Sequence, residues 1–147
     1  MKPLTSSDKK KILNQLNEQF GIMEIPGLII QFGKEKLRLY TGNLSKEELY
    51  HLDNEARIET IGLYFAKQEQ CEIRLTLDGV QFFKNQLKKN ILEINDKQAD
   101  DWLKGNDLDI KEDKKWFILK HKNEFLGCGK STGEKISNFV PKERRIR

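Results

Sequence analysis

The stretch that decides the fold is residues 116–130, WFILKHKNEFLGCGK. It contains two apolar segments, 116–119 and 125–128, separated by a polar and charged turn. Such a pattern is typical of two neighbouring strands. Leu108 and the segment 136–140 are further apolar stretches, and charged or glycine-containing turns separate all of them. We therefore predict a small β-barrel in this part of the chain.

A strand and a helix are expected immediately before these segments. Residues 91–94 are apolar enough for a short strand, and Asp96 then leads into a helical stretch at 97–104. Gly105 and Asn106 follow and should end that helix. The charge balance of the chain changes at Lys88, so we place a subdomain boundary there.

The first 87 residues predict an antiparallel sheet with helices. Ile12, Leu16 and Phe20 recur every four residues, which indicates an amphipathic helix capped by Ser6 or Ser7 and ended by Gly21. A hairpin is expected at 28–32 and 36–39, and a second strand pair at 61–65 and 73–77. Ser45 and Glu48 form a capping box that predicts a helix at 46–52, and residues 79–87 form a further helical stretch.

Together these elements predict an α+β fold of two parts. Residues 1–87 form an α/β N-terminal subdomain, and residues 88–147 form a small β-barrel. At 147 residues the chain has room for one domain or two small ones.

Charge is unevenly distributed along the chain. Residues 1–87 carry twelve basic and twelve acidic groups, residues 88–113 carry five and eight, and residues 114–147 carry ten and three. The last segment is therefore the electropositive end, and a dense cationic surface is what a phosphate backbone attracts.

Composition excludes several classes of protein. No apolar run approaches the length of a membrane span, and the N-terminus lacks an apolar signal segment, so we expect a cytoplasmic protein. Cys71 and Cys128 are too few for a disulfide framework or a four-cysteine zinc site. His51 and His121 lie far apart in sequence without a ligand pattern, and we expect no metal and no cofactor.

The C-terminal segments resemble a known RNA-binding fold. A helix, a turn, a hydrophobic strand and then Phe125-Leu126-Gly127-Cys128-Gly129-Lys130 are similar to the PUA domain, a compact pseudobarrel. The closing stretch 133–142, GEKISNFVPK, with Arg144 and Arg145, is similar to the PUA-like end of Nop/Sun-type RNA cytosine methyltransferases.

The layout of the whole chain also resembles the Nip-seven family of ribosome-assembly factors. Ile61-Gly62-Leu63 to Lys67 and Arg74-Leu75-Thr76-Leu77 precede the PUA-like part, as an α/β pre-PUA domain does in that family. This resemblance implies a protein partner for the N-terminal subdomain.

The candidate RNA-binding residues are the cations of the PUA-like part. We predict phosphate contacts by Lys104, Lys130, Lys135, Lys142, Arg144, Arg145 and Arg147. The acidic residues between 100 and 113 depart from a uniformly basic RNA face. Asp100 and Asp101 point in different directions on a helix, so we expect a solvated face there rather than paired acid/base groups.

Other features of this region have competing interpretations. Gly127, Gly129 and Gly133 allow a close approach either of RNA or of a neighbouring strand. Trp102 and Phe139 are of the type that stacks on bases, but we expect both in the core. A phosphate loop at 129–131 is not expected, because Glu124 stands where that motif needs a glycine.

Three functional hypotheses follow. The first is a noncatalytic RNA-binding protein that acts on structured rRNA or tRNA in ribosome biogenesis or RNA modification. The second is the detached RNA-targeting subunit of an RNA cytosine methyltransferase. The third is a protein-interaction module whose basic tail meets an acidic partner or aids solubility.

Overall fold

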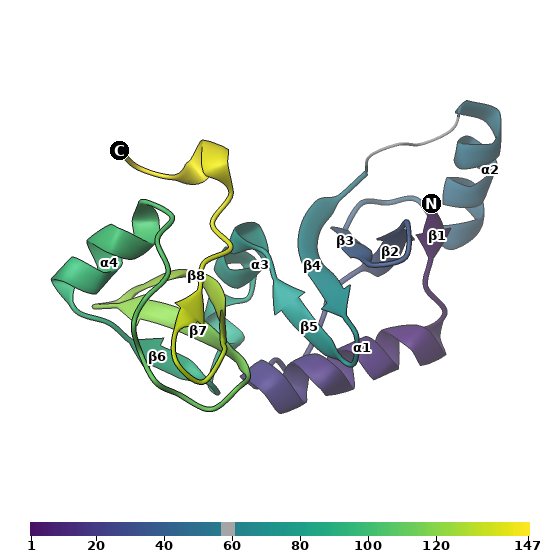
Figure 1. Ribbon diagram of the computed structural model, residues 1–147. Coiled ribbons are helices and arrows are strands. Elements are labelled where there is room, and N and C mark those ends of the chain that lie inside the picture. Colours follow the sequence, from purple (N-terminus) through teal and green to yellow (C-terminus); the bar gives the residue numbers. More distant parts are fainter. Residues whose placement is uncertain (57–60) are drawn as a thin grey trace.

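The computed structural model describes residues 1–56 and 61–147, and it has two sheets that meet at a short central helix, α3 (Figure 1). The first half consists of β1 (Lys2–Pro3), α1 (Ser6–Phe20), β2 (Leu28–Phe32), β3 (Lys36–Tyr40), α2 (Lys46–Ala56), β4 (Leu63–Glu69), β5 (Glu72–Leu75) and α3 (Leu77–Phe82). A 3₁₀ turn at Lys84–Gln86 ends it.

The second half is built around a curled sheet. Its elements are β6 (Ile91–Glu93), α4 (Asp96–Leu103), β7 (Trp116–His121), β8 (Glu124–Ser131), β9 (Ile136–Ser137) and a closing 3₁₀ turn at Lys142–Arg144. The predicted α+β fold is confirmed, with an antiparallel sheet and helices first and the curled sheet second.

The long helix α1 buries the face that the sequence predicted. Ile12, Leu16 and Phe20 are all buried, and Gly21 ends the helix in a left-handed conformation with φ of 82°. The predicted serine cap is wrong by one residue. Thr5 has the extended backbone of an N-cap, and its Oγ1 accepts a hydrogen bond from the Asp8 backbone N–H at 3.1 Å, whereas Ser6 and Ser7 already lie within the helix.

The first sheet has the order β1-β2-β3-β4-β5 and is antiparallel throughout. Both predicted strand pairs are present, and the capping box is confirmed by reciprocal bonds between Ser45 and Glu48. Leu77 is not in the second pair as predicted. It starts α3 instead, because Thr76 Oγ1 caps that helix by accepting from the Gly79 N–H at 3.0 Å.

Helix α3 packs closely between the two sheets. A Cβ atom on Gly79 would collide with the Phe65 carbonyl oxygen of β4, so only glycine lets the helix approach that strand. On its other side α3 contacts β8. The helix therefore joins the two halves directly.

Helix α1 also connects the halves at its C-terminal end. The Gln19 side chain donates to the Ile73 carbonyl at 2.9 Å and accepts from the Ile73 N–H at 2.8 Å. It thus pairs two backbone groups at the open edge of β5. Asn90 Nδ2 donates to the Gln19 carbonyl at 2.6 Å, and the Lys88 N–H donates to the Phe20 carbonyl at 2.9 Å. The end of α1 is thus bonded to β5 of the first sheet and to the segment that leads into β6.

The second sheet has the order β6-β7-β8-β9. β6 pairs with β7 in parallel, and the other two pairs are antiparallel. Leu108 extends the curl through two backbone hydrogen bonds with Ile136, at 3.0 and 2.8 Å. The predicted barrel is therefore a curled half-barrel.

Two apolar clusters stabilise the fold. The smaller surrounds Trp102 in the second half, whereas the larger extends from α1 and the first sheet to Trp116, Ile118 and Cys128 of the second. The boundary between residues 87 and 88 stays a prediction, and apolar packing crosses it. No helix among residues 1–56 and 61–147 is long and apolar enough to cross a membrane.

Candidate nucleic-acid interface

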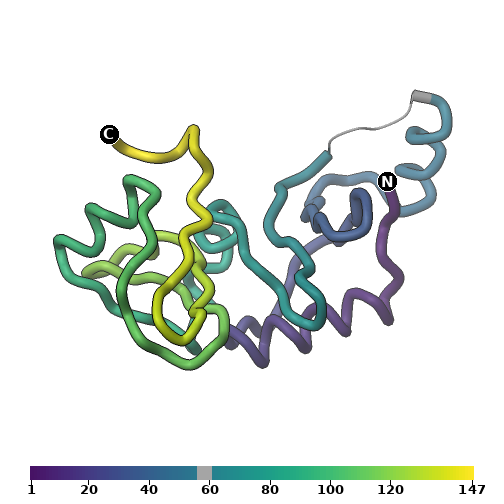
Figure 2. Tube along the Cα trace, viewed as in Figure 1, coloured from purple at the N-terminus to yellow at the C-terminus, as the bar shows by residue number. Residues whose placement is uncertain are grey.

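The C-terminal segment runs along the seam between the two halves. Figure 2 shows it rising past β8 and then turning toward α4. Arg144 Nη1 lies 3.1 Å from Asp78 Oδ1 in the first turn of α3, and the Ile146 N–H donates to the Leu103 carbonyl at 2.9 Å. The segment is therefore attached to both the first half and α4.

This course encloses a groove between the first sheet and the C-terminal segment. Its volume is about 410 Å³, within the range of roughly 300–1,000 Å³ typical of small-ligand sites. The first half contributes Tyr64, Arg74, Thr76, Leu77 and Asp78, and the C-terminal segment contributes Phe139, Pro141, Glu143 and Arg144. Neither half forms the groove alone.

A stack of two rings with a cation at each end borders the groove. The Arg74 guanidinium lies 4.8 Å from the centre of the Phe139 ring, and that ring lies 5.3 Å from the Trp116 ring at an angle of 48°. Lys130 Nζ lies 5.2 Å from the Trp116 ring. Phe139 is 39% exposed, so the expectation that it packs in the core is wrong, whereas Trp102 is fully buried as expected.

Two donors beside Phe139 lack hydrogen-bond partners among the described residues. They are Arg74 Nε and Trp116 Nε1, and both atoms are buried. Arg74 Nε lies 3.7 Å from Glu69 Oε1, which is an ion pair but too long for a hydrogen bond. Buried donors are nearly always satisfied, so this is a place where the protein's own hydrogen bonding is incomplete.

Tyr64 provides a second ring in the groove, and two cations flank it. Lys36 Nζ lies 5.6 Å from its ring centre and the Arg38 guanidinium lies 5.8 Å from it. The Arg38 side chain is held by a 3.0 Å hydrogen bond to the Gly62 carbonyl. Aromatic rings interleaved with cations are typical of surfaces that bind single-stranded nucleic acid.

Several cations that the sequence singled out are paired with acidic neighbours. Lys104 Nζ lies 2.8 Å from Asp100 on the solvated face of α4, and this contact raises the pKa of Lys104. Asp101 pairs with Lys97 in the same manner, at 3.1 Å. Asp100 and Asp101 thus bind separate lysines, as expected of an exposed helix face.

The predicted arginines differ from one another in their surroundings. Arg145 lies against Gly105, and its Nε donates to the Val140 carbonyl at 2.9 Å, so it holds the C-terminal segment in place. Lys142 and Arg147 are exposed, and their side chains make no hydrogen bond or ion pair with the part of the chain that the structure describes. The structure therefore separates held cations from free ones.

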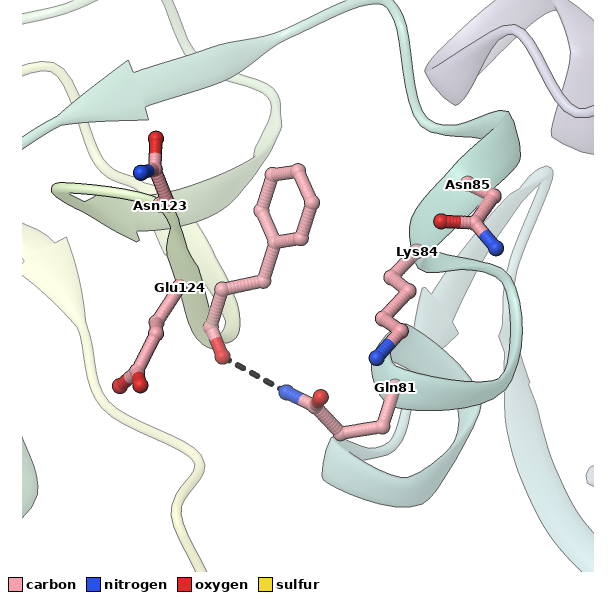
Figure 3. Close-up of a pocket in the computed structure, with 6 residues that line it drawn as sticks. Gln81, Lys84, Asn85, Asn123 and Glu124 are labelled. Atoms are coloured by element: carbon pink, nitrogen blue, oxygen red, sulfur yellow. Dashed lines mark hydrogen bonds between the residues drawn. The ribbon is translucent and has the colours of Figure 1, made fainter.

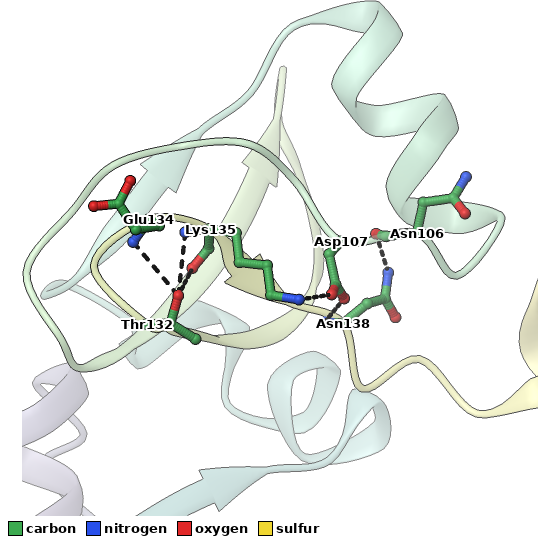
Figure 4. A network of polar contacts seen from close by, with 6 residues as sticks. All are labelled: Asn106, Asp107, Thr132, Glu134, Lys135 and Asn138. Atoms are coloured by element: carbon green, nitrogen blue, oxygen red, sulfur yellow. Dashed lines mark hydrogen bonds and ion pairs between the residues drawn. The ribbon is translucent and has the colours of Figure 1, made fainter.

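Asp107, one of the acidic residues that interrupt the basic region, forms a network with Asn138 (Figure 4). Asp107 accepts from Lys135 Nζ at 2.9 Å and from the Asn138 N–H at 2.8 Å, and both contacts lower the pKa of the Asp107 carboxyl. Asn138 Nδ2 donates to the Trp102 and Asn106 carbonyls at 2.8 and 2.9 Å. This Asp107–Asn138 network fixes the segment before Phe139.

The glycines of β8 have a packing role. A Cβ atom on Gly129 would lie 2.6 Å from the Trp102 ring and 2.7 Å from Ile136, so glycine leaves room for the buried tryptophan. Ser131 Oγ donates to the Glu112 carbonyl at 2.8 Å within a regular strand. Residues 129–131 therefore lack the loop-to-helix form of a phosphate loop.

The remaining titratable groups do not assemble into a further site. Burial raises the pKa of the Cys128 thiol to about 12, which makes it inert, and Cys71 is exposed. His121 Nε2 lies 2.7 Å from Asp96, and this hydrogen bond lowers the pKa of that carboxyl. Within residues 1–56 and 61–147 there is no cluster of side chains able to hold a metal ion.

A second, polar hollow lies on another face between the halves (Figure 3). It has a volume of about 560 Å³, and Gln81 Nε2 closes one side by donating to the Phe125 carbonyl at 2.7 Å. Lys84, Asn85, Asn123 and Glu124 complete its lining with Phe125. Its one lysine is balanced by its one glutamate, and it lacks the paired cations and open rings of the groove.

The second half matches a known family model. The model of the methyltransferase RsmF PUA domain matches residues 89–146, one residue after the predicted start of the second subdomain. This part of the chain is therefore a PUA domain of the RsmF type. The resemblance to the PUA fold and to Nop/Sun-type methyltransferases is confirmed, while the likeness to the Nip-seven family stays a prediction.

Two curated proteins extend the likeness to most of the chain. It is 24% identical over 146 residues to the ribosomal RNA small subunit methyltransferase F of Psychromonas ingrahamii, and 21% identical over 144 residues to that of Aeromonas salmonicida. These matches cover 95% and 96% of this chain but 29% of each relative, so the chain spans less than a third of their length.

A solved structure shares the arrangement of both halves. The crystal structure of a hypothetical protein from the archaeon Pyrococcus horikoshii OT3 superposes with a TM-score of 0.57 at 13% identity. The superposition covers 94% of this chain and 92% of that one. At 13% identity, the superposition shows that the two chains share a fold.

Proposed function

We propose that this chain is an RNA-binding module that acts on structured rRNA or tRNA, in ribosome biogenesis or RNA modification, and that supplies no catalytic group itself. The observation that carries the proposal is the PUA domain at residues 89–146, because this domain type implies RNA binding. We place its action in the cytoplasm, and its two unpaired cysteines are consistent with a reducing compartment.

The distribution of charge supports the same conclusion. Lys142 and Arg147 are exposed and free to meet phosphates, and Lys130 lies over the Trp116 ring that borders the groove. Neutralising phosphates releases condensed counterions, so such contacts make affinity depend steeply on salt. The paired cations Lys104, Lys135 and Arg144 are weaker candidates, since binding RNA would break their existing ion pairs.

Titration of the protein with total tRNA and with rRNA fragments at two salt concentrations tests the proposal. We expect binding that weakens at the higher salt, and further weakening in the double variant Lys142→Ala, Arg147→Ala. Lys10→Ala, Lys11→Ala is the matched control, because it removes two exposed cations from α1. Failure of the intact protein to bind any of these RNAs would favour the protein-interaction module instead.

A second candidate function is to target a separate RNA methyltransferase to its substrate. The matches to two rRNA methyltransferases, which cover 95% or more of this chain, favour it. The first half would then hold the partner enzyme. Co-purification with a methyltransferase, and faster methylation when the protein is added, are the expected results. Unchanged methylation by a catalytic chain that does bind this protein would contradict it.

A further inference from the structure

The groove combines groups from both halves of the molecule, and this suggests how it is used. Tyr64 and Arg74 come from β4 and β5, whereas Phe139 and Arg144 come from the C-terminal segment. We propose that this groove receives one unstacked base of single-stranded RNA, so that the first sheet forms half of the RNA site. The inference rests on the proposed function and names the part of the RNA that the groove binds.

The rings suit a base because they are open and firmly supported. Phe139 keeps 39% of its surface exposed although the Arg74 guanidinium and the Trp116 ring contact it at 4.8 and 5.3 Å. The adjacent Asp107–Asn138 network fixes its backbone, and the Val140 N–H donates to Asn138 Oδ1 at 2.7 Å. A ring held in advance loses little conformational freedom when a base stacks on it.

The charges of the groove favour a base over a phosphate. Arg74 and Arg144 are accompanied by Asp78 and Glu143, so cations and carboxylates are equal in number. A phosphate gains little in such a setting, whereas a base edge carries both donors and acceptors. Asp78 already pairs with Arg144 at 3.1 Å, which leaves the exposed Glu143 to accept from an amino group.

The two donors without hydrogen-bond partners also favour this groove as the binding site. Arg74 Nε and Trp116 Nε1 lie on the two residues that contact Phe139, and no described residue accepts from them. Elsewhere in the second half comparable donors are satisfied, as when Trp102 Nε1 donates to the Leu126 carbonyl at 2.9 Å. Incomplete hydrogen bonding is therefore concentrated beside the open ring.

The test compares ring-removing variants in the full chain. Fluorescein-labelled oligouridylate and oligoadenylate serve as single-stranded probes, and the duplex that they form together is the paired probe. We expect Phe139→Leu and Tyr64→Leu each to weaken binding of a single strand about 5- to 150-fold, as loss of one base–ring stack does. Phe139→Tyr should restore affinity, and Tyr50→Leu, an exposed ring on α2, is the matched control.

Salt dependence separates stacking from phosphate contacts. The ring variants should leave the slope of log affinity against log salt unchanged, because no phosphate contact is lost. Thermal unfolding of each variant verifies that it folds. Single-strand binding that is unaltered by both ring variants would overturn the groove assignment while leaving RNA binding intact, and so would an equal loss on the paired probe. No RNA binding by the intact protein would overturn both proposals.

Discussion

The Asp107–Asn138 network and the groove beside Phe139 are neighbours in sequence but opposite in character. In the network Asp107 neutralises Lys135 and accepts from the Asn138 N–H, and the Asn138 side chain donates to the Asn106 carbonyl (Figure 4). In the groove the Phe139 ring is exposed, and two buried donors beside it lack hydrogen-bond partners among the described residues. Polar groups that are satisfied within the protein stabilise it, whereas the exposed Phe139 ring leaves a surface on which a ligand can pack.

The largest effect that separates the two regions is expected from their aromatic residues. Trp102→Ala should lower the free energy of unfolding by about 3–5 kcal/mol, because it empties a fully buried site under the network. Phe139→Ala, the matched change in the groove, should lower it by only about 1 kcal/mol. Urea denaturation measures both, and equal losses would contradict the distinction.

The next effect concerns the hydrogen bonds of the network. Asn138→Ala removes the donors to the Trp102 and Asn106 carbonyls and the acceptor for the Val140 N–H. We expect a loss of about 1–3 kcal/mol in unfolding free energy, since it leaves partly buried groups unpaired. Asn85→Ala, an exposed asparagine in the 3₁₀ turn, is the control and should change stability by less than about 0.5 kcal/mol.

Arg145 and Lys142 of the C-terminal segment allow a hydrogen-bonded cation to be compared with a free one. Arg145→Gln should lower stability by about 1 kcal/mol, because its Nε bond to the Val140 carbonyl is disturbed. Lys142→Gln should leave the unfolding midpoint unchanged, yet reduce the salt slope of RNA binding by about 0.7–0.9 for one lost phosphate contact. Reversed outcomes for the two variants would refute the assignment.

The smallest expected effect is the pH dependence of the network. The Lys135 ammonium and the Asn138 N–H hold the pKa of Asp107 below its usual value, so the contribution to stability is present above about pH 4 and is lost as the pH falls further. The pair is exposed to solvent, so this contribution is below about 1 kcal/mol. Asp107→Asn should remove that part of the acid dependence in thermal unfolding, whereas Asp109→Asn should retain it.

Local patterns in the sequence predicted most of the elements of the fold. The spacing of Ile12, Leu16 and Phe20, the box at Ser45 and Glu48, and the alternation in the hairpins each act over a few residues, and the structure contains all of them. The errors lie at element ends. Leu77 continues a strand pattern by its apolar character, but the Thr76 hydroxyl decides the end by capping α3.

The site was less accessible to sequence reasoning, because its groups are distant in the chain. Arg74 and Phe139 are sixty-five positions apart in the sequence, and only the folded chain brings the guanidinium to 4.8 Å from the ring centre. Charge counting identified the basic end but treated Arg145 and Lys142 alike, although one is bonded and the other is free. The partners of a cation depend on the tertiary structure, so charge counting along the sequence cannot predict them.

Photo-crosslinking determines whether single-stranded RNA lies in the groove between the two halves. Single-stranded RNA that contains 4-thiouridine is bound to the full chain, irradiated and digested, and the modified peptides are identified by mass spectrometry. We expect adducts on the peptides that contain Tyr64 and Phe139, from both halves of the molecule. Adducts confined to peptides outside the groove, such as those of α2 or the polar hollow around Gln81, would contradict this expectation.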